Sequence, residues 1–318
     1  MIVELRERPA KVSINIMSWL IFAFSGPVLW ALSTHLDKYL VDRFFKDSDI
    51  AVLLVFTALI GIITLPVIAA FVPAVLFVSS GAIALMVLSG ALYIAALLFY
   101  LRALQSEEAS TVAPFFQMGP LIGYVLGYFI LGEVLTGAQM TGGALIVAGT
   151  LLVSVRSGKR TPRFKARIAG LMLTSATFMA LSSLLFKIFA LRDEFWTTTF
   201  WMFVGEGVFG IALLAYAPYR RKFVALMRSH TGAVLAINGA NELINLGGGL
   251  GNRYALMLAP LSIVQAIGST TTLFVFAFGV ILALCFPAFG RETISARELI
   301  QKGGAALLVA AGVVLVSR

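Results

Sequence analysis

The sequence is poor in charge. Only 12% of its 318 residues are Asp, Glu, Lys or Arg, and 60% are hydrophobic, whereas a soluble domain carries about 25% charged residues. A single cysteine, Cys285, excludes an intrachain disulfide and gives no support for a zinc site. Neither GxxxxGK[ST] nor HExxH occurs, and two histidines supply little for metal or nucleophilic chemistry. The low charge argues against a soluble globular protein. Because the motifs and residues for such chemistry are missing, we predict no enzyme activity, no metal and no cofactor.

The net charge of +9 does not indicate a nucleic-acid partner. The basic residues lie between apolar runs, where Lys and Arg orient membrane spans. Mean hydropathy is +0.97, which favours a lipid bilayer as the surroundings of most side chains.

The apolar runs predict ten transmembrane helices. A helix needs about 20 apolar residues to cross a bilayer, and continuous apolar runs differ from the alternating strands of a barrel. No linker is long enough to hold a soluble domain. The predicted spans are 14–36, 50–72, 79–103, 109–131, 136–155, 167–190, 196–217, 232–256, 259–286 and 299–316.

The two halves of the chain resemble each other. Ala31-Leu32-Ser33 matches Ala180-Leu181-Ser182 at an offset of 149, and Lys38 matches Lys187 at the same offset. Conserved order over several such matches indicates duplication. We therefore predict a five-helix repeat over 1–156, a basic loop over 157–166 and a second repeat over 167–318. Since five is odd, the second repeat must insert inverted, as in many secondary transporters.

The end of the first repeat resembles a known pattern. Its residues are Leu131-Gly132-Glu133, Gln139, Gly142-Gly143, Ile146 and Gly149, preceded by the segment Tyr93 to Pro120. This stretch is similar to the EamA-type repeat of the ten-helix branch of the drug/metabolite transporter superfamily. The resemblance implies export or exchange of small metabolites, amino acids or drugs. The second half departs from the pattern with a longer link, in which Glu292 is not a secure counterpart of Glu133.

The distribution of Lys and Arg and the family resemblance predict opposite orientations in the membrane. Most Lys and Arg fall on the face opposite the two termini, including the cluster in the 157–166 loop and its flanks. The positive-inside rule then places both termini outside, whereas the family resemblance implies termini inside.

Glu206 is the sharpest candidate for function. It lies about ten residues into the span 196–217, hence roughly 15 Å deep at 1.5 Å per residue. An ionised carboxylate at that depth costs at least about 2.5 kcal/mol. Glu206 must therefore face a wet cavity, pair with a cation or carry a proton, and the alternative is a structural hydrogen bond between helices.

The eighth span carries a polar stripe. Asn238, Asn241, Glu242 and Asn245 follow the i, i+3, i+4, i+7 spacing of one helix face. Such a face should line a cavity, or else the asparagines act as interhelical glue. The glycine-rich run Gly247–Gly251 that follows predicts a bend or break, with close helix packing as the alternative.

Further candidates are weaker. Gln117 and Gln265 offer amides to a cavity, and the repeat-related Lys38 and Lys187 could act as gates or attract anions, unless they only snorkel to the interface. Glycines 119, 123 and 127 form a double GxxxG expected to pack against another helix. The charge run Arg220-Arg221-Lys222 is expected to be a solvated, headgroup-facing loop.

The sequence thus favours a multi-pass carrier in the cell membrane that works by alternating access on a small-molecule solute. Two membrane carboxylates suit proton coupling, because burial favours their protonated form and water or substrate entry reverses this. The fused halves favour a monomer. The alternatives are a lipid or lipid-linked sugar translocase, and a non-transporting membrane subunit or sensor.

Overall fold

The computed structural model describes residues 16–44, 51–106, 115, 118–154, 166–285 and 296–317. Within these ranges the regular elements are helices, as predicted. They are α1 (Ile16–Phe44), α2 (Ala51–Phe71), η2 (Pro73–Leu76), α3 (Ser80–Ser106), α5 (Met118–Leu126), the π-helix η4 (Gly127–Leu131), α6 (Gly137–Ser154), α7 (Ala166–Asp193), α8 (Phe195–Ala215), α9 (Ala217–Leu258), α10 (Leu261–Gly268), α11 (Thr271–Cys285) and α12 (Ala296–Val316).

Six segments in the described part of the chain are long and apolar enough to cross a membrane. They are Trp19–Asp37, Leu54–Phe71, Ser80–Ala103, Ala166–Asp193, Phe195–Ala215 and Leu261–Leu282. Three more apolar helical segments are shorter. The helical membrane class is therefore confirmed, while the count of ten spans and the inverted repeat stay predictions.

The chain forms two compact units, and the segments of each are not consecutive. Unit 1 falls within Met1–Leu32, Glu108–Ala166 and Gly248–Arg318. Unit 2 falls within Ser33–Glu107 and Arg167–Gly247. Each unit therefore draws on both predicted repeats, and the helices α1 and α9 each contribute to both units.

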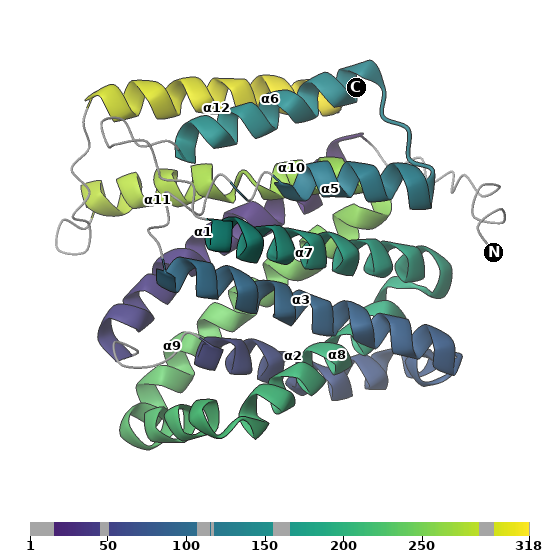
Figure 1. Ribbon diagram of the computed structural model, residues 1–318, viewed down its shortest axis with the longest axis vertical. Helices are drawn as coiled ribbons and strands as arrows, with labels where there is room; N and C mark the ends of the chain where they lie inside the picture. The colour runs from purple at the N-terminus through teal and green to yellow at the C-terminus, as the bar shows by residue number, and fades with distance from the viewer. Residues whose placement is uncertain are drawn as a thin grey trace. The chain divides into compact units, whose positions relative to one another are not determined.

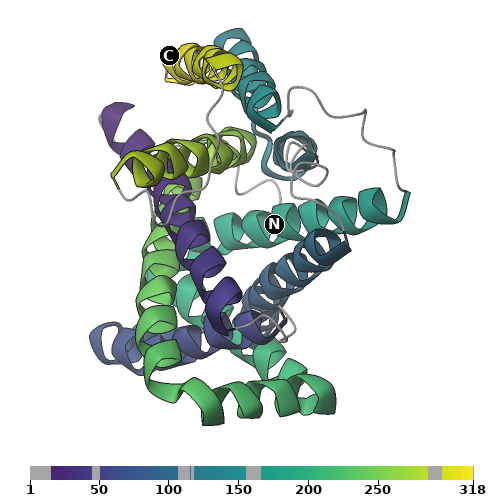
Figure 2. The same ribbon diagram turned by 90° about the vertical axis from the view of Figure 1, so that its left-hand side faces the viewer.

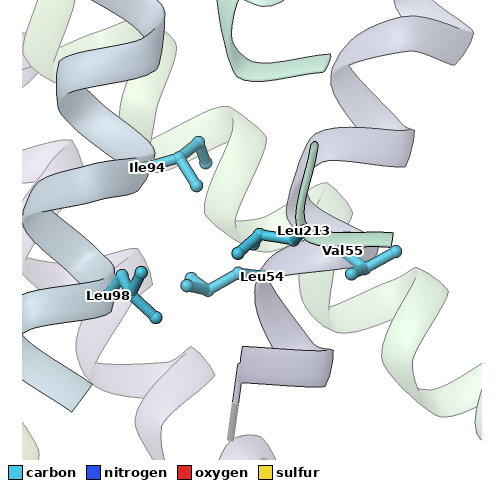
Figure 3. Packing of buried hydrophobic residues seen from close by; sticks show 5 residues of the cluster. All are labelled: Leu54, Val55, Ile94, Leu98 and Leu213. Atoms are coloured by element: carbon cyan, nitrogen blue, oxygen red, sulfur yellow. The ribbon is translucent and has the colours of Figure 1, made fainter. Parts of the chain in front are cut away.

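Unit 2 is built around α8, which packs against α2 and α3. Its core joins Leu54 and Val55 of α2, Ile94 and Leu98 of α3, and Leu213 of α8 (Figure 3). Two glycines bring α3 and α8 into close approach. A Cβ on Gly90 of α3 would overlap the Met202 carbonyl of α8, and one on Gly205 of α8 would overlap the Val87 carbonyl of α3.

Unit 1 contains the pair α6 and α12, which run side by side (Figure 1). Glycines form their contact. A Cβ on Gly142 would lie 2.6 Å from the Gly312 carbonyl oxygen, and one on Gly312 would lie 2.6 Å from the Gly142 carbonyl oxygen. A Cβ on Gly149 would lie 2.8 Å from the Ala305 carbonyl oxygen. These backbone contacts fit the rule that small residues let membrane helices approach closely.

The prediction of a loop at Arg220-Arg221-Lys222 is wrong, because these residues belong to α9. Pro218 is tolerated in the first turn, and Arg and Lys are good helix formers. On the other face, Leu226 joins a buried cluster with Leu40 of α1 and Phe56 of α2. The 42 residues of α9 would extend about 63 Å at 1.5 Å each, about twice the bilayer core. Figure 2 shows this long green helix changing direction along its course.

The expected break at Gly247–Gly251 is also absent, since α9 stays helical through it. The alternative, close helix packing, is what the structure shows for the two glycines that face α1, Gly248 and Gly251. A Cβ on Gly248 would lie 3.1 Å from Trp30 Nε1, and one on Gly251 would overlap Ser25.

An interruption occurs instead in the predicted span 259–286, between α10 and α11. There the hydroxyls of Thr270 and Thr271 donate to the carbonyls of Ile267 and Gly268. Local side-chain bonds of this kind compete with helix hydrogen bonds.

Candidate functional site

The predicted stripe on α9 is buried inside unit 2. Asn238, Asn241 and Glu242 are 1%, 0% and 5% exposed, and Asn245 is partly buried. A helix turn of 3.6 residues places them on one face. Because neither water nor lipid satisfies these groups, they need partners from neighbouring helices.

Two of those partners come from α1 and α2. The Asn241 side-chain amide donates to Asp37 Oδ1 at 2.7 Å, and the Thr57 hydroxyl donates to Glu242 Oε1 at 3.1 Å. Asp37 lies on α1 and Thr57 on α2. Three helices therefore bring polar side chains to one place in the unit. We call Asp37, Thr57, Asn238, Asn241 and Glu242 the polar cluster.

Further polar groups surround the polar cluster. Glu206, on α8, is 2% exposed. Both Glu206 and Asp37 interact electrostatically with Glu242. Tyr100 of α3 lies within electrostatic reach of Asp37. The close approach of α3 and α8 at Gly90 includes the backbone nitrogen of Glu206, 2.8 Å from a Cβ at that position. Gly90, which has no side chain, thus lets α3 pack closely against the α8 backbone at Glu206.

Several atoms of the polar cluster lack a hydrogen-bond partner in the described part of the chain. They are both polar side-chain atoms of Asn238, the Asn241 Oδ1 and the Glu242 Oε2. Buried polar groups are nearly always hydrogen-bonded. Unmatched polar atoms gathered on one buried helix face are therefore groups that a solute, a proton or a water molecule could satisfy.

The described residues contain no group of three or more His, Cys, Asp or Glu that could hold a metal ion.

The other predicted candidates are distributed differently. Lys187 of α7 is 6% exposed and lies in unit 2. The side chain of Lys38 and the whole of Gln117 lie outside the described residues, so pairing of the two lysines as gates stays a prediction. Gln265 lies on α10 in unit 1, and neither of its side-chain polar atoms has a partner within the described ranges.

Gln265 lies against the predicted glycine face. A Cβ on Gly123 would come 2.5 Å from Gln265 Oε1, and one on Gly119 would come 3.7 Å from it. The packing of α5 on α10 matches the structural role expected for the double GxxxG. Gln265 thus occupies space that the glycines of α5 leave within unit 1.

The family-like motif that contains Glu133 and Gln139 forms hydrogen bonds at the starts of helices in unit 1. Glu133 Oε2 accepts the backbone N–H of Leu261 at 2.9 Å, at the first residue of α10. Thr136 and Gln139 form a reciprocal capping box, with the Thr136 N–H donating to Gln139 Oε1 at 3.0 Å and the Gln139 N–H to Thr136 Oγ1 at 3.2 Å. These bonds satisfy backbone donors that a helix start leaves open.

Sequence reasoning missed Asp37 and Thr57 as members of the polar cluster. Ser33 and Asp37 are one helical turn apart and interact. A polar pair at that spacing inside an apolar span is the signal that could have found Asp37.

Comparison with known proteins decides the family. The sequence model of the EamA-like transporter family matches residues 17–155. The permease-like protein YdzE of Bacillus subtilis is 41% identical over 58 residues, which make up 18% of this chain and 74% of that protein. The chain belongs to the EamA-like transporter family. Members of this family are transporters rather than enzymes, and this EamA-like chain is a multi-pass membrane protein.

A solved crystal structure of a protein has the same fold. It aligns with a TM-score of 0.63 over 94% of the EamA-like chain and 95% of the other chain, at 14% identity. At that identity the likeness establishes the fold and nothing about the solute. The family match ends at residue 155, so it includes Asp37 and Thr57 of the polar cluster. The α9 stripe and Glu206 come from the second half of the chain.

Proposed function

We propose that this EamA-like protein is a secondary carrier that moves a small polar solute by alternating access through the polar cluster of unit 2. The observation that carries the proposal is the set of unmatched polar atoms on Asn238, Asn241 and Glu242, all three of which are buried on α9. Ionisable groups inside a membrane bundle are costly and are kept for substrate or ion pathways.

Protons are the proposed coupling ion. Asp37 and Glu206 both act electrostatically on Glu242, and like charges in a desolvated site oppose one another. A proton on one carboxyl group relieves that repulsion, and a solute that competes with the proton gives exchange. The ten-span arrangement of two inverted five-helix repeats, the cell membrane and the monomeric state belong to the same proposal.

The test is solute uptake into liposomes that contain the purified protein, with and without an imposed pH gradient. A mixed set of amino acids, primary amines and carboxylic acids serves as the solute panel. Glu242→Gln should lose the response to the gradient, because the amide cannot exchange a proton at neutral pH. Glu194→Gln is the matched control, since Glu194 is exposed at the start of α8.

Gradient-driven, saturable uptake by the wild type and the control alone supports the proposal. Equal gradient-driven uptake by Glu242→Gln would overturn proton coupling at this residue. No uptake of any solute would overturn the carrier role and favour a translocase or a non-transporting subunit.

A further inference from the structure

The hydrogen-bond balance of the polar cluster determines which chemistry a ligand must bring. An ionised carboxylate only accepts hydrogen bonds, while an asparagine amide offers two N–H donors and one accepting oxygen. Asp37 Oδ1 receives the Asn241 Nδ2 at 2.7 Å. That bond fixes the Asn241 amide, because the reversed amide would set its oxygen against the carboxylate. The Asn241 Oδ1 is therefore left as an unused acceptor.

Glu242 shows the same division between its two oxygens. Oε1 accepts from the Thr57 hydroxyl at 3.1 Å, and the Asn245 side chain also acts as a hydrogen-bond donor to this carboxyl group. Within the described part of the chain, Oε2 is the oxygen that has no partner at hydrogen-bond distance. Asn238 lies one turn earlier on the same face, and neither of its polar atoms is matched. Whichever way its amide is turned, Asn238 adds one acceptor and one donor group.

Unmatched acceptors therefore outnumber unmatched donors on this face of α9. Three oxygens, on Asn238, Asn241 and Glu242, stand against the single amide nitrogen of Asn238. The charge has the same bias, because Glu242 is joined by the carboxyl groups of Asp37 and Glu206. A ligand that completes the cluster must bring several N–H donors and positive charge.

We infer that the polar cluster of unit 2 binds organic cations that carry a primary ammonium group, with Glu242 Oε2, Asn241 Oδ1 and Asn238 Oδ1 as its acceptors. A primary ammonium has three N–H donors and one positive charge, which matches three acceptors beside a carboxylate. This inference rests on the proposed carrier function and names the solute class of the same site.

Other solute classes fit the cluster less well. A carboxylate or phosphate would bring more acceptors and a second negative charge next to Glu242. A neutral alcohol brings one donor and leaves the charge unmatched. A quaternary ammonium carries the charge but has no N–H, so all three acceptors would stay unsatisfied, which is costly in a buried site. Discrimination between primary and quaternary ammonium is therefore the distinctive expectation.

Four probes with one skeleton test this inference by isothermal titration against the purified full-length protein in detergent. They are phenethylammonium, its N,N,N-trimethyl counterpart, phenylpropionate and phenethyl alcohol. We expect phenethylammonium to bind saturably. The trimethyl compound should bind with an affinity at least about tenfold lower, because the loss of hydrogen bonds to a charged group costs at least the equivalent of a tenfold change in affinity. Phenylpropionate and phenethyl alcohol should give no saturable heat. Binding of phenylpropionate, or equal binding of both ammonium compounds, would overturn the inference.

Two variants separate a binding role from a structural one. Asn238→Asp replaces the unmatched donor by a second charged acceptor and should tighten phenethylammonium binding about tenfold, a gain that damage to the fold cannot produce. Glu242→Gln keeps an acceptor for Thr57 but removes the charge, and should weaken binding at least about tenfold. Glu194→Gln should bind as the wild type does. Unchanged affinity in both cluster variants would place the cation elsewhere.

Failure of the inference and failure of the carrier function give different results. Gradient-driven uptake limited to acids or neutral solutes, without ammonium binding, would remove the cation class and keep the carrier. Ammonium binding that depends on Asn238 and Glu242, without uptake of any probe, would keep the site and remove the carrier.

Discussion

The two units differ in how completely their polar side chains are hydrogen-bonded. In unit 1 the residues of the family-like motif complete their bonds locally, since Glu133 accepts the first backbone N–H of α10 and Gln139 caps α6. In unit 2 the polar cluster joins three helices and still leaves atoms on Asn238, Asn241 and Glu242 unmatched. The contrast teaches that the recognisable motif serves the packing of the fold, and we propose that the transport chemistry belongs to residues outside it.

Gly142→Val should give the largest change, a loss of stability in unit 1. The new side chain would meet the Gly312 carbonyl oxygen, which lies 2.6 Å from a Cβ there. Overpacking of this kind costs about 3 kcal/mol. Thermal unfolding in detergent should show a lower midpoint, while Gly303→Val should not, since a Cβ on Gly303 meets nothing within 4 Å. Equal midpoints for the two variants would contradict the packing account.

Glu242→Gln should separate function from stability in unit 2. Gradient-driven uptake should fall at least about tenfold, equivalent to about 1.4 kcal/mol. The unfolding midpoint should stay or rise, because removing a buried, incompletely satisfied charge relieves its desolvation cost. Uptake and unfolding are measured on the same preparations. A fall in the midpoint as large as that of Gly142→Val would show that Glu242 is structural.

Gln139→Ala should have a moderate effect confined to stability. It removes the side-chain acceptor for the Thr136 N–H at the start of α6, and loss of a helix cap costs about 1 kcal/mol. The uptake rate per folded molecule should not change. Gln139→Glu keeps an acceptor at the same position and should restore the midpoint, and a failure of this rescue would argue against the capping role.

Thr57→Val should give the smallest effect, shared between stability and transport. The variant removes one donor to Glu242 Oε1, and this bond is long, at 3.1 Å, and only partly buried, so its loss should cost about 0.5 kcal/mol, at the low end for a protein hydrogen bond. Thr57→Ser keeps the hydroxyl and should behave as the wild type does. A solute affinity that is identical in the valine and serine variants would show that Thr57 does not hold the carboxylate.

Much of the fold could be predicted from apolar runs alone. The predicted span 50–72 compares with α2 at Ala51–Phe71, and 196–217 with α8 at Phe195–Ala215. Errors arose where helix structure does not follow hydropathy. The basic start of α9 is polar yet helical, because Leu226 on its other face has a buried cluster to join.

The candidate site was predictable only within one helix. Spacing placed Asn238, Asn241 and Glu242 on one face, since that relation is local. Their partners Asp37 and Thr57 lie far away in the sequence, and nothing in the local pattern indicates which helices meet. The same limit applies to Gly247–Gly251, where packing partners for Gly248 and Gly251 decide between a break and a continuous helix.

The most direct test of the central claim compares one substitution in both units. Glu242→Gln in unit 2 and Glu133→Gln in unit 1 each remove a single carboxylate and keep an acceptor. The initial rate of gradient-driven uptake into liposomes is measured for both variants beside the wild type. A transport site in unit 2 predicts loss of uptake in Glu242→Gln and a near wild-type rate in Glu133→Gln. Loss in Glu133→Gln with a normal rate in Glu242→Gln would contradict the account.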